Sequence, residues 1–227
     1  MKRRAVVLLS GGVDSATTLF TAKKRGYECY PLIFDYRQRH RREIESAKRI
    51  SRKAGLRYKI LKIALPWKGS SLLEEDVKLP KARRDREMRK GIPSSYVPAR
   101  NTIFLSYALS FAEAIGAEKI FIGVNAVDFS GYPDCRSPYL KAFGKVIKEG
   151  TKAGAEGRGI SVEAPLLFKT KAEIIKKGAR LGVPYGDTWS CYEGKRAPCG
   201  ACDSCIIRAR GFKEAGIEDP LMDNGRR

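Results

Sequence analysis

Hydrophobic and polar positions alternate along this chain in two ways, one typical of buried strands and one of amphipathic helices. Short apolar runs bounded by turn residues predict five strands, at residues 5–9, 29–35, 58–63, 119–124 and 160–164. Amphipathic segments between them predict helices at residues 14–25, 41–54, 101–115 and 171–181. Glycines typical of helix ends follow, at Gly26, Gly55, Gly116 and Gly182. This alternation favours an α/β fold with a doubly wound, mostly parallel five-stranded sheet.

Two segments depart from the alternation. Residues 66–96 are charged and interrupted by prolines, which predicts either a mobile segment or a lid over the site. Residues 150–159 contain four glycines and predict a flexible connection. Because the chain has 227 residues, of which 43% are hydrophobic, we expect one main domain at residues 1–185 and a small C-terminal element at residues 186–227.

The chain is strongly basic, with 45 Lys and Arg residues against 25 Asp and Glu and a formal net charge of +20. This excess favours polyanionic partners such as ATP, pyrophosphate or nucleic acid, although a solvated charged surface explains it equally well. No apolar run approaches the roughly 20 residues that cross a bilayer, so we expect no membrane partner. The basic residues 2–4 lead directly into the first predicted strand without a cleavable signal, and we expect a cytoplasmic protein.

Four of the six cysteines fall within fifteen residues near the C-terminus. Cys199, Cys202 and Cys205 form two consecutive C-x-x-C steps, and Cys191 precedes them. In a cytoplasmic protein such clustering predicts a metal before disulfides, and four thiolates favour tetrahedral Zn²⁺ in a structural role. A redox C-x-x-C pair and an iron–sulfur cluster are the competing interpretations. Cys29 lies in a predicted strand and is expected in the core.

The sequence SGGVDS at residues 10–15, called here the 10–15 loop, joins the first predicted strand to the first helix. Its paired glycines allow the backbone to approach a phosphate closely, and the helix amides and dipole then face the anion. Ser10 and Ser15 add hydroxyl donors, and Asp14 either orders the loop or helps to hold Mg²⁺. A simple tight turn is the alternative. The loop has neither the spaced glycines of a dinucleotide fingerprint nor the ending of a Walker A loop.

The 10–15 loop resembles the SGGxDS signature of the PP-loop ATP pyrophosphatases, whose fold is that of the adenine-nucleotide hydrolases. The resemblance implies that ATP, with Mg²⁺, binds with its β,γ-pyrophosphate on this loop while a substrate oxygen attacks the α-phosphate. The ATP-binding residues it implies are Leu9, Ser10, Gly11, Gly12, Val13, Asp14, Ser15, Ala16, Thr17 and Asp35. Asp35 ends the second predicted strand, at the edge where open α/β sheets bind ligands, or is a simple turn residue.

Further motifs make the resemblance more specific. Residues 96–101 (YVPARN), 130–136 (SGYPDCR) and 188–192 (TWSCY), together with the cysteine cluster, resemble the 7-cyano-7-deazaguanine synthases over almost the whole chain. This implies an ATP-dependent carbon–nitrogen ligase that converts 7-carboxy-7-deazaguanine and ammonia to the nitrile through adenylated acid and amide intermediates. The product would serve queuosine or archaeosine synthesis. We also expect a homodimer, and leave direct nucleic-acid binding open.

The resemblance also suggests residue roles. Asp134 is expected to accept from the guanine-like edge of the substrate, and Arg136 to bind its carboxylate or the α-phosphate, unless the two simply pair in a loop. Arg100 is a candidate phosphate ligand, and Asn101 either shares this site or caps the helix that follows.

Lys169 and Lys171, between the fifth strand and its helix, resemble a second, lysine-bearing phosphate element, with solvent exposure as the alternative. His40 lies in a motif similar to the family's Gln-Arg-His element and is placed near the adenylate or ammonia, or on the surface. The family usually carries glycine where this chain has Arg37. If that position requires positive φ, arginine is strained there.

Two other functions compete with this one. A PP-loop tRNA-modifying enzyme, such as a sulfurtransferase or a lysidine-type ligase, would use the basic charge to bind RNA, but the chain shows no appended RNA-binding module. A zinc-ribbon nucleic-acid-binding protein would explain the charge and the cysteines, and would leave the 10–15 loop unexplained.

Overall fold

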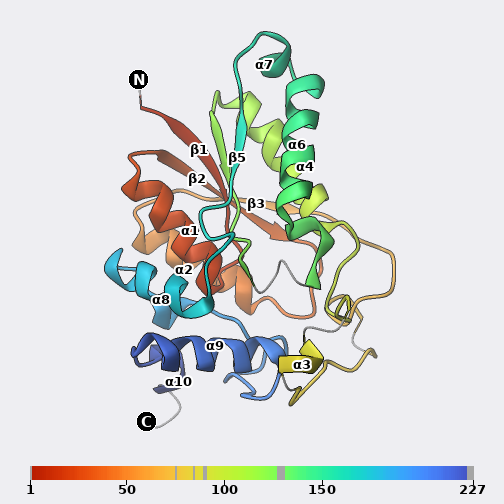
Figure 1. Cartoon of the computed structure of the whole chain (residues 1–227), viewed down its shortest axis with the longest axis vertical. Coiled ribbons are helices and arrows are strands. Elements are labelled where there is room, and N and C mark those ends of the chain that lie inside the picture. The colour runs from red at the N-terminus through yellow and green to blue at the C-terminus, as the bar shows by residue number, and fades with distance from the viewer. Residues whose placement is uncertain (1, 75, 84, 89–90, 127–130, 224–227) are drawn as a thin grey trace.

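The computed structural model describes residues 2–74, 76–83, 85–88, 91–126 and 131–223. A five-stranded parallel sheet in the order β3-β2-β1-β4-β5 forms its centre (Figure 1). The strands are β1 (Arg4–Leu8), β2 (Glu28–Asp35), β3 (Lys59–Lys62), β4 (Lys119–Phe121) and β5 (Ser161–Glu163). All five predicted strands, and the doubly wound fold, are therefore confirmed.

The four predicted helices are also confirmed, as α1 (Val13–Lys24), α2 (Arg42–Lys53), α4 (Arg100–Ala114) and α8 (Lys171–Arg180). The glycines predicted to end them have φ between 65° and 82°, a conformation that L side chains rarely adopt. Further helices were not predicted: α3 (Asp85–Met88), α6 (Ser137–Gly150), α7 (Lys152–Ala155), α9 (Asp203–Ala215) and α10 (Pro220–Asp223), with 3₁₀ turns η1 (Pro133–Cys135) and η2 (Tyr185–Asp187). Within the described residues, no helix is both long and apolar enough to cross a membrane.

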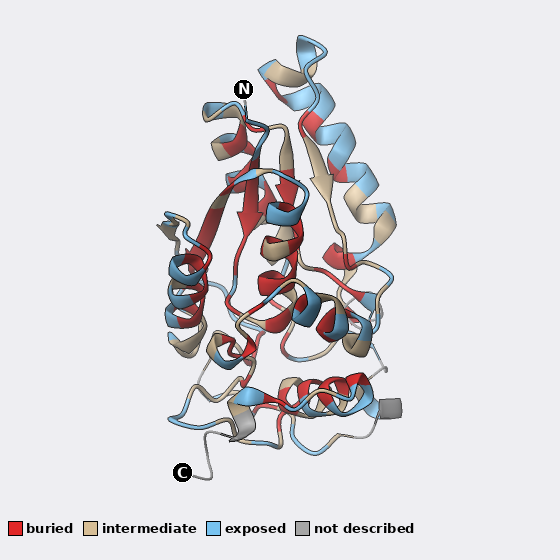
Figure 2. Ribbon diagram, turned by 90° about the vertical axis from the view of Figure 1, so that its left-hand side faces the viewer, coloured by how far each residue is buried: buried red, intermediate tan, exposed pale blue. Residues whose placement is uncertain are grey.

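Alternate residues of β1 face two separate cores, because successive side chains of a strand point to opposite faces of the sheet. Ala5 and Val7 pack with α1, α2, α8 and Phe212 of α9. Val6 and Leu8 pack with α4 and α6. Helices therefore cover both faces of the sheet (Figure 1), and the central strands are buried on both sides (Figure 2).

The sheet order places a topological switch point between β1 and β4. From β1 the chain moves outward through β2 and β3, and then returns to the other side of β1 as β4. In open α/β sheets, ligands bind beyond the carboxyl ends of the strands at such a point. The 10–15 loop leaves β1 at this place, and Gly123 follows β4 there: a Cβ on Gly123 would lie 3.0 Å from the Ser15 nitrogen.

Residues 66–96 are anchored to the C-terminal element through the part of the segment that the structure describes. Lys81 forms an antiparallel bridge with Cys202, and Arg83 makes a forked ion pair with Asp203. Ser70 and Ser71 are fully buried. These contacts fix the segment at residues 70–71 and 81–83 to the rest of the fold.

The expectation for residues 150–159 needs a correction. Instead of a purely flexible connection, the segment contains α7, because Thr151 caps it by accepting a hydrogen bond from the Gly154 nitrogen at 2.9 Å. Ser130, in the SGYPDCR motif, and residues 224–227 of the expected C-terminal element lie outside the described residues.

Two helical glycines predict stability effects of opposite sign. A Cβ at Gly178 of α8 would overlap the buried Tyr185 hydroxyl and lie 2.7 Å from the Thr17 hydroxyl, whereas a Cβ at Gly144 of α6 would meet nothing within 4 Å. We expect Gly178→Ala to lower the free energy of unfolding by about 1–3 kcal/mol. Gly144→Ala should raise it by about 0.5–1 kcal/mol through helix propensity. Urea denaturation of both variants tests this, and equal effects would contradict it.

Candidate functional site

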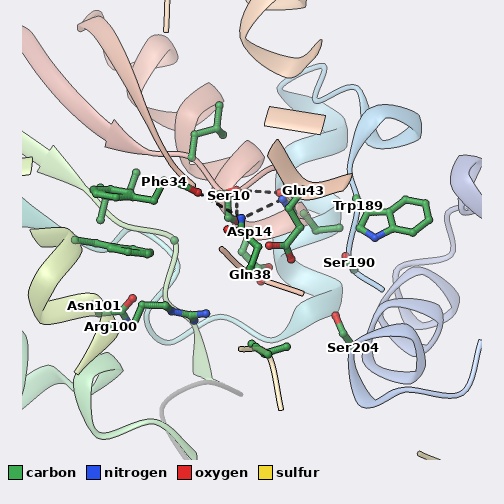
Figure 3. A pocket seen from close by; sticks show the side chains of 18 of the residues that line it. Ser10, Asp14, Phe34, Gln38, Glu43, Arg100, Asn101, Trp189, Ser190 and Ser204 are labelled. Atoms are coloured by element: carbon green, nitrogen blue, oxygen red, sulfur yellow. Dashed lines mark hydrogen bonds between the residues drawn. The ribbon is translucent and has the colours of Figure 1, made fainter. Parts of the chain in front are cut away.

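A cavity of about 280 Å³ opens where the 10–15 loop leaves β1. Its walls come from the 10–15 loop, the end of β2, the first turns of α2, α4 and α8, and the C-terminal element (Figure 3). Of the residues predicted from the sequence, it is lined by Leu9, Ser10, Gly12, Val13, Asp14, Ser15, His40, Arg100 and Lys171. The fold therefore brings most of the predicted ATP-binding and catalytic residues to one cavity.

Close packing of α2 shapes the 10–15 loop. Gly11 has φ of +90°, and a Cβ there would overlap the carbonyl oxygen of Glu43 and lie 2.7 Å from the Ala47 nitrogen. The hydroxyl of Ser15 accepts from the Gly11 nitrogen at 3.2 Å and lies 3.0 Å from the Ser10 hydroxyl. These contacts order the loop, and the first turn of α1 faces the cavity. Gly11, Ala16 and Thr17 shape this turn without lining the cavity.

Asp14 and Lys171 form an ion pair across the cavity mouth. The Lys171 ammonium donates to both Asp14 oxygens, at 2.8 and 2.6 Å, and the Asn125 amide donates to the same carboxylate at 3.1 Å. Asn125 is 1% exposed. Asp14 therefore orders the loop, and it holds Lys171 where an arriving phosphate would meet it.

On the opposite wall, Arg100 donates to the Tyr36 hydroxyl at 3.1 Å, and its guanidinium lies over the Tyr36 ring. Tyr36 is buried, and removal from water raises its pKa. Beside them the rings of Phe34 and Phe104 stack with centroids 4.0 Å apart. This wall combines a cation with a flat apolar surface, which suits a nucleotide base joined to a phosphate.

Glu43 points into the same cavity from α2, close to Ser10 and Asp14 (Figure 3). Removal from water raises the pKa of this carboxyl to about 7, although the positive charge of Arg100 acts in the opposite direction. No described residue donates a hydrogen bond to it, and none forms an ion pair with it. A carboxylate in this setting is poised to meet a ligand.

The turn after β2 places two predicted residues differently. Asp35 accepts from Arg41 at 3.1 Å and from the Arg37 nitrogen at 3.4 Å. It therefore braces the turn and does not line the cavity. Arg37 has φ of 60°, so the position that glycine usually occupies does require the left-handed region. His40 does line the cavity, and burial lowers its pKa while contact with Cys191 raises it.

Three other predicted residues lie away from the cavity lining: Asp134, Arg136 and Lys169. Asp134 is 6% exposed, and it accepts from the backbone nitrogen of Asn101 at 2.9 Å. Asp134 thereby holds the start of α4. Ala99, not Asn101, is the N-cap residue of this helix. Among the described residues, Asp134 forms no ion pair with Arg136. Arg136 is exposed at the start of α6.

The four clustered cysteines converge on one point. The sulfurs of Cys191, Cys199, Cys202 and Cys205 all lie within 4.8 Å of one another. Zn–S bonds of about 2.3 Å would place sulfurs roughly 3.8 Å apart in a tetrahedron, so the donor set fits Zn²⁺. Hydrogen bonds from Cys202 and Cys205 lower the pKa of Cys191, which favours a thiolate there. The backbone nitrogen of Trp189 donates to the Gly11 carbonyl at 2.9 Å and connects the C-terminal element to the 10–15 loop.

Several cavity residues were missed by the sequence analysis. The C-terminal element contributes Ser190, Tyr192, Ser204 and Arg208, and the main domain contributes Tyr36, Glu43, Phe104 and Tyr132. An acid in the first turn of a helix is ordinarily explained by the helix dipole, so Glu43 gave no signal. The available indication was its position three residues after His40, shortly after the Gln-Arg-His element.

The fold and site define a PP-loop ATP-binding enzyme, with its loop at the carboxyl end of β1 and a basic cavity beyond it. The family model "Queuosine biosynthesis protein QueC" matches residues 4–216. The chain belongs to this family.

Named relatives agree with the family match. The 7-cyano-7-deazaguanine synthase of Trichodesmium erythraeum (strain IMS101) is 52% identical over 221 residues, covering 96% of this chain and 100% of the relative. That of Desulfatibacillum aliphaticivorans is 52% identical over 223 residues, covering 96% of each. Among solved structures, NMN synthetase from Francisella tularensis matches with a TM-score of 0.51 and 14% identity, over 99% of this chain and 76% of that one. That likeness shows the fold alone.

The Asp14–Lys171 pair predicts a specific catalytic loss. We expect Lys171→Met to lower turnover about a hundredfold, because a charged donor that lines the cavity and would meet the ATP phosphates is lost. Lys176→Met, on the exposed side of the same helix, should leave turnover unchanged. Steady-state assays of AMP release, with melting curves to confirm folding, compare the two variants. Equal rates for the two would remove Lys171 from the mechanism.

Proposed function

We propose that this chain is a 7-cyano-7-deazaguanine synthase, which converts 7-carboxy-7-deazaguanine, ammonia and ATP to the nitrile, AMP and pyrophosphate. The observation that carries the proposal is a family match over residues 4–216, with relatives of that name covered over nearly their full length. The cavity supports it, because the 10–15 loop, Lys171 and Arg100 face one space. Neither a tRNA-modifying enzyme nor a zinc-ribbon protein gains support from the family match.

In this proposal the 10–15 loop and the first turn of α1 hold the β,γ-pyrophosphate, with Lys171 against the phosphates. Asp14 is the protein group that would help to hold Mg²⁺. The Phe34 and Phe104 rings offer their apolar wall to adenine, and Arg100 stabilises the charge that develops as the substrate carboxylate attacks the α-phosphate. No protein nucleophile is needed, since the substrate oxygen attacks and the chain positions and neutralises.

The remaining site assignments stay predictions. Lys169 is proposed at the phosphates, His40 near the adenylate or ammonia, and Asp134 and Arg136 at the substrate. Asp134 makes a buried contact with Asn101, and Asn101 lines the cavity. This contact supports an effect of Asp134 on substrate binding through the start of α4. Asp35 is proposed to act on ATP only through the turn that it braces.

The wider context is proposed on chemical grounds. The clustered cysteines and the use of ATP support a cytoplasmic location, and the active form is proposed to be a homodimer. The product would feed queuosine synthesis, as the family description indicates, or archaeosine. The net charge of +20 would attract anionic substrates to the cavity.

The reaction itself gives the first test. Incubation with ATP, ammonium and 7-carboxy-7-deazaguanine should yield the nitrile, with two molecules of AMP released per molecule of nitrile. The reason for this ratio is that the acid and then the amide are each activated by adenylation. Mass spectrometry of the base and chromatography of the nucleotides measure both. A product that stops at the amide, or ATP hydrolysed only to ADP, would contradict the proposal.

The cysteine cluster gives the second test. We expect one Zn²⁺ per chain, and Cys202→Ser to lower thermal stability and increase protease cleavage around residues 66–83, because Lys81 pairs with Cys202. Cys29→Ser, in the buried strand β2, serves as the control and should keep the metal. Elemental analysis and limited proteolysis provide the readouts. Iron with sulfide, or a metal-free protein of full stability, would overturn the zinc assignment.

A further inference from the structure

The charges that line the cavity are unevenly distributed. Among the described lining residues the side-chain carboxylates belong to Asp14 and Glu43, and the cations are Arg39, Arg100, Lys171 and Arg208. Lys171 is ion-paired with Asp14 and Arg208 with Asp219, so Arg39 and Arg100 set the charge that an arriving ion meets beside Glu43. Such a lining suits ATP and a carboxylate substrate, but it repels ammonium, the form in which ammonia is mainly present at neutral pH. Ammonium therefore needs a carboxylate at the place where it enters.

Asp14 already has other partners, since Lys171 and Asn125 both donate to it and it is proposed to help to hold Mg²⁺. Glu43 is available, because its carboxylate has no described hydrogen-bond or ion-pair partner. Its backbone carbonyl packs against Gly11, so the side chain emerges beside the loop proposed to hold the pyrophosphate (Figure 3). Glu43 also interacts electrostatically with Arg100, which is proposed to act at the α-phosphate, so the reaction is proposed to take place at this end of the cavity.

We propose that Glu43 binds ammonium and accepts a proton from it, so that ammonia is released beside the acyl adenylate. The inference rests on the proposed function and deepens it. Ammonium gives one proton to a Glu43 oxygen, and the freed lone pair attacks the acyl carbon. The C–N bond forms, the C–O bond to AMP breaks, and AMP leaves with the electron pair. The excess proton on the new amide nitrogen passes to the departing phosphate, and Glu43 returns its proton to solvent.

The surroundings of Glu43 suit a proton acceptor. Arg100 of α4 and Tyr36 after β2 are the charged and titratable groups that act on it electrostatically. Removal from water raises the pKa of Glu43 to about 7, which is closer to that of ammonium than an ordinary carboxyl would be. A base with a pKa near the working pH is the more effective proton acceptor.

The test separates adenylation from amination in the isosteric variant Glu43→Gln. Exchange of labelled pyrophosphate into ATP, with 7-carboxy-7-deazaguanine and without ammonium, should continue at the wild-type rate. The ammonium-dependent kcat/KM should fall about a hundredfold. The rate that remains in Glu43→Gln should follow the concentration of free ammonia alone as the pH rises. Glu43→Asp should recover part of the rate.

Hydroxylamine tests the proton transfer directly, because it is largely neutral at pH 7 and needs no base. Glu43→Gln should form the hydroxamate at the wild-type rate while it fails with ammonium. The control Glu45→Gln removes an exposed carboxylate of the same helix, ion-paired with Lys48, and should change neither rate.

Three outcomes overturn the inference. If the wild type makes product and the ammonium-dependent kcat/KM of Glu43→Gln is unchanged, the inference on Glu43 is overturned and the proposed function stands. If Glu43→Gln loses both pyrophosphate exchange and affinity for 7-carboxy-7-deazaguanine, Glu43 instead binds the base edge of the substrate. A wild-type protein that makes neither amide nor nitrile overturns the proposed function and this inference together.

Discussion

The close approach of α2 to Gly11 is the constraint on which the site depends. Only a residue without Cβ allows the Glu43 carbonyl and the Ala47 nitrogen to pack against the loop, and the φ of +90° at Gly11 turns the chain into α1. The same contact positions three parts at once. It orders the serine hydroxyls, directs the first turn of α1 at the cavity, and brings the Glu43 carboxylate beside the loop.

The charged side chains of the cavity fall into two groups, cations that are paired and the carboxylate of Glu43. Lys171 is held by Asp14, and Arg100 is held against Tyr36, so both cations are fixed before a phosphate arrives. Preorganised charge of this kind stabilises a transition state without reorganisation at the moment of reaction. Glu43 differs because no described residue pairs with it, and the free-energy cost of keeping its carboxylate away from water is offset by protonation or by a ligand. This contrast assigns the two acids of the cavity to different tasks.

The cysteine element joins parts of the chain that are distant in sequence. Trp189 bonds to Gly11, Lys81 and Arg83 bond to the region of Cys202 and Asp203, and Ser190 and Ser204 reach the cavity. The buried Arg208–Asp219 pair, with distances of 2.7 and 2.8 Å, fixes α9 to the segment that follows it. A metal bound here would therefore stabilise one wall of the active site as well as its own loop.

The sequence by itself determined the strands, four main helices, the 10–15 loop and the cysteine cluster, because each is encoded by local periodicity or by residues close along the chain. The tertiary structure decided which side chains share the cavity. Glu43, Phe104 and Ser204 come from elements far apart in sequence, while Asp134, Arg136 and Lys169 were expected at the cavity and do not line it. The physical reason is that a motif fixes a residue's type and spacing. The direction of its side chain depends on the long-range packing of the helix or turn that carries it.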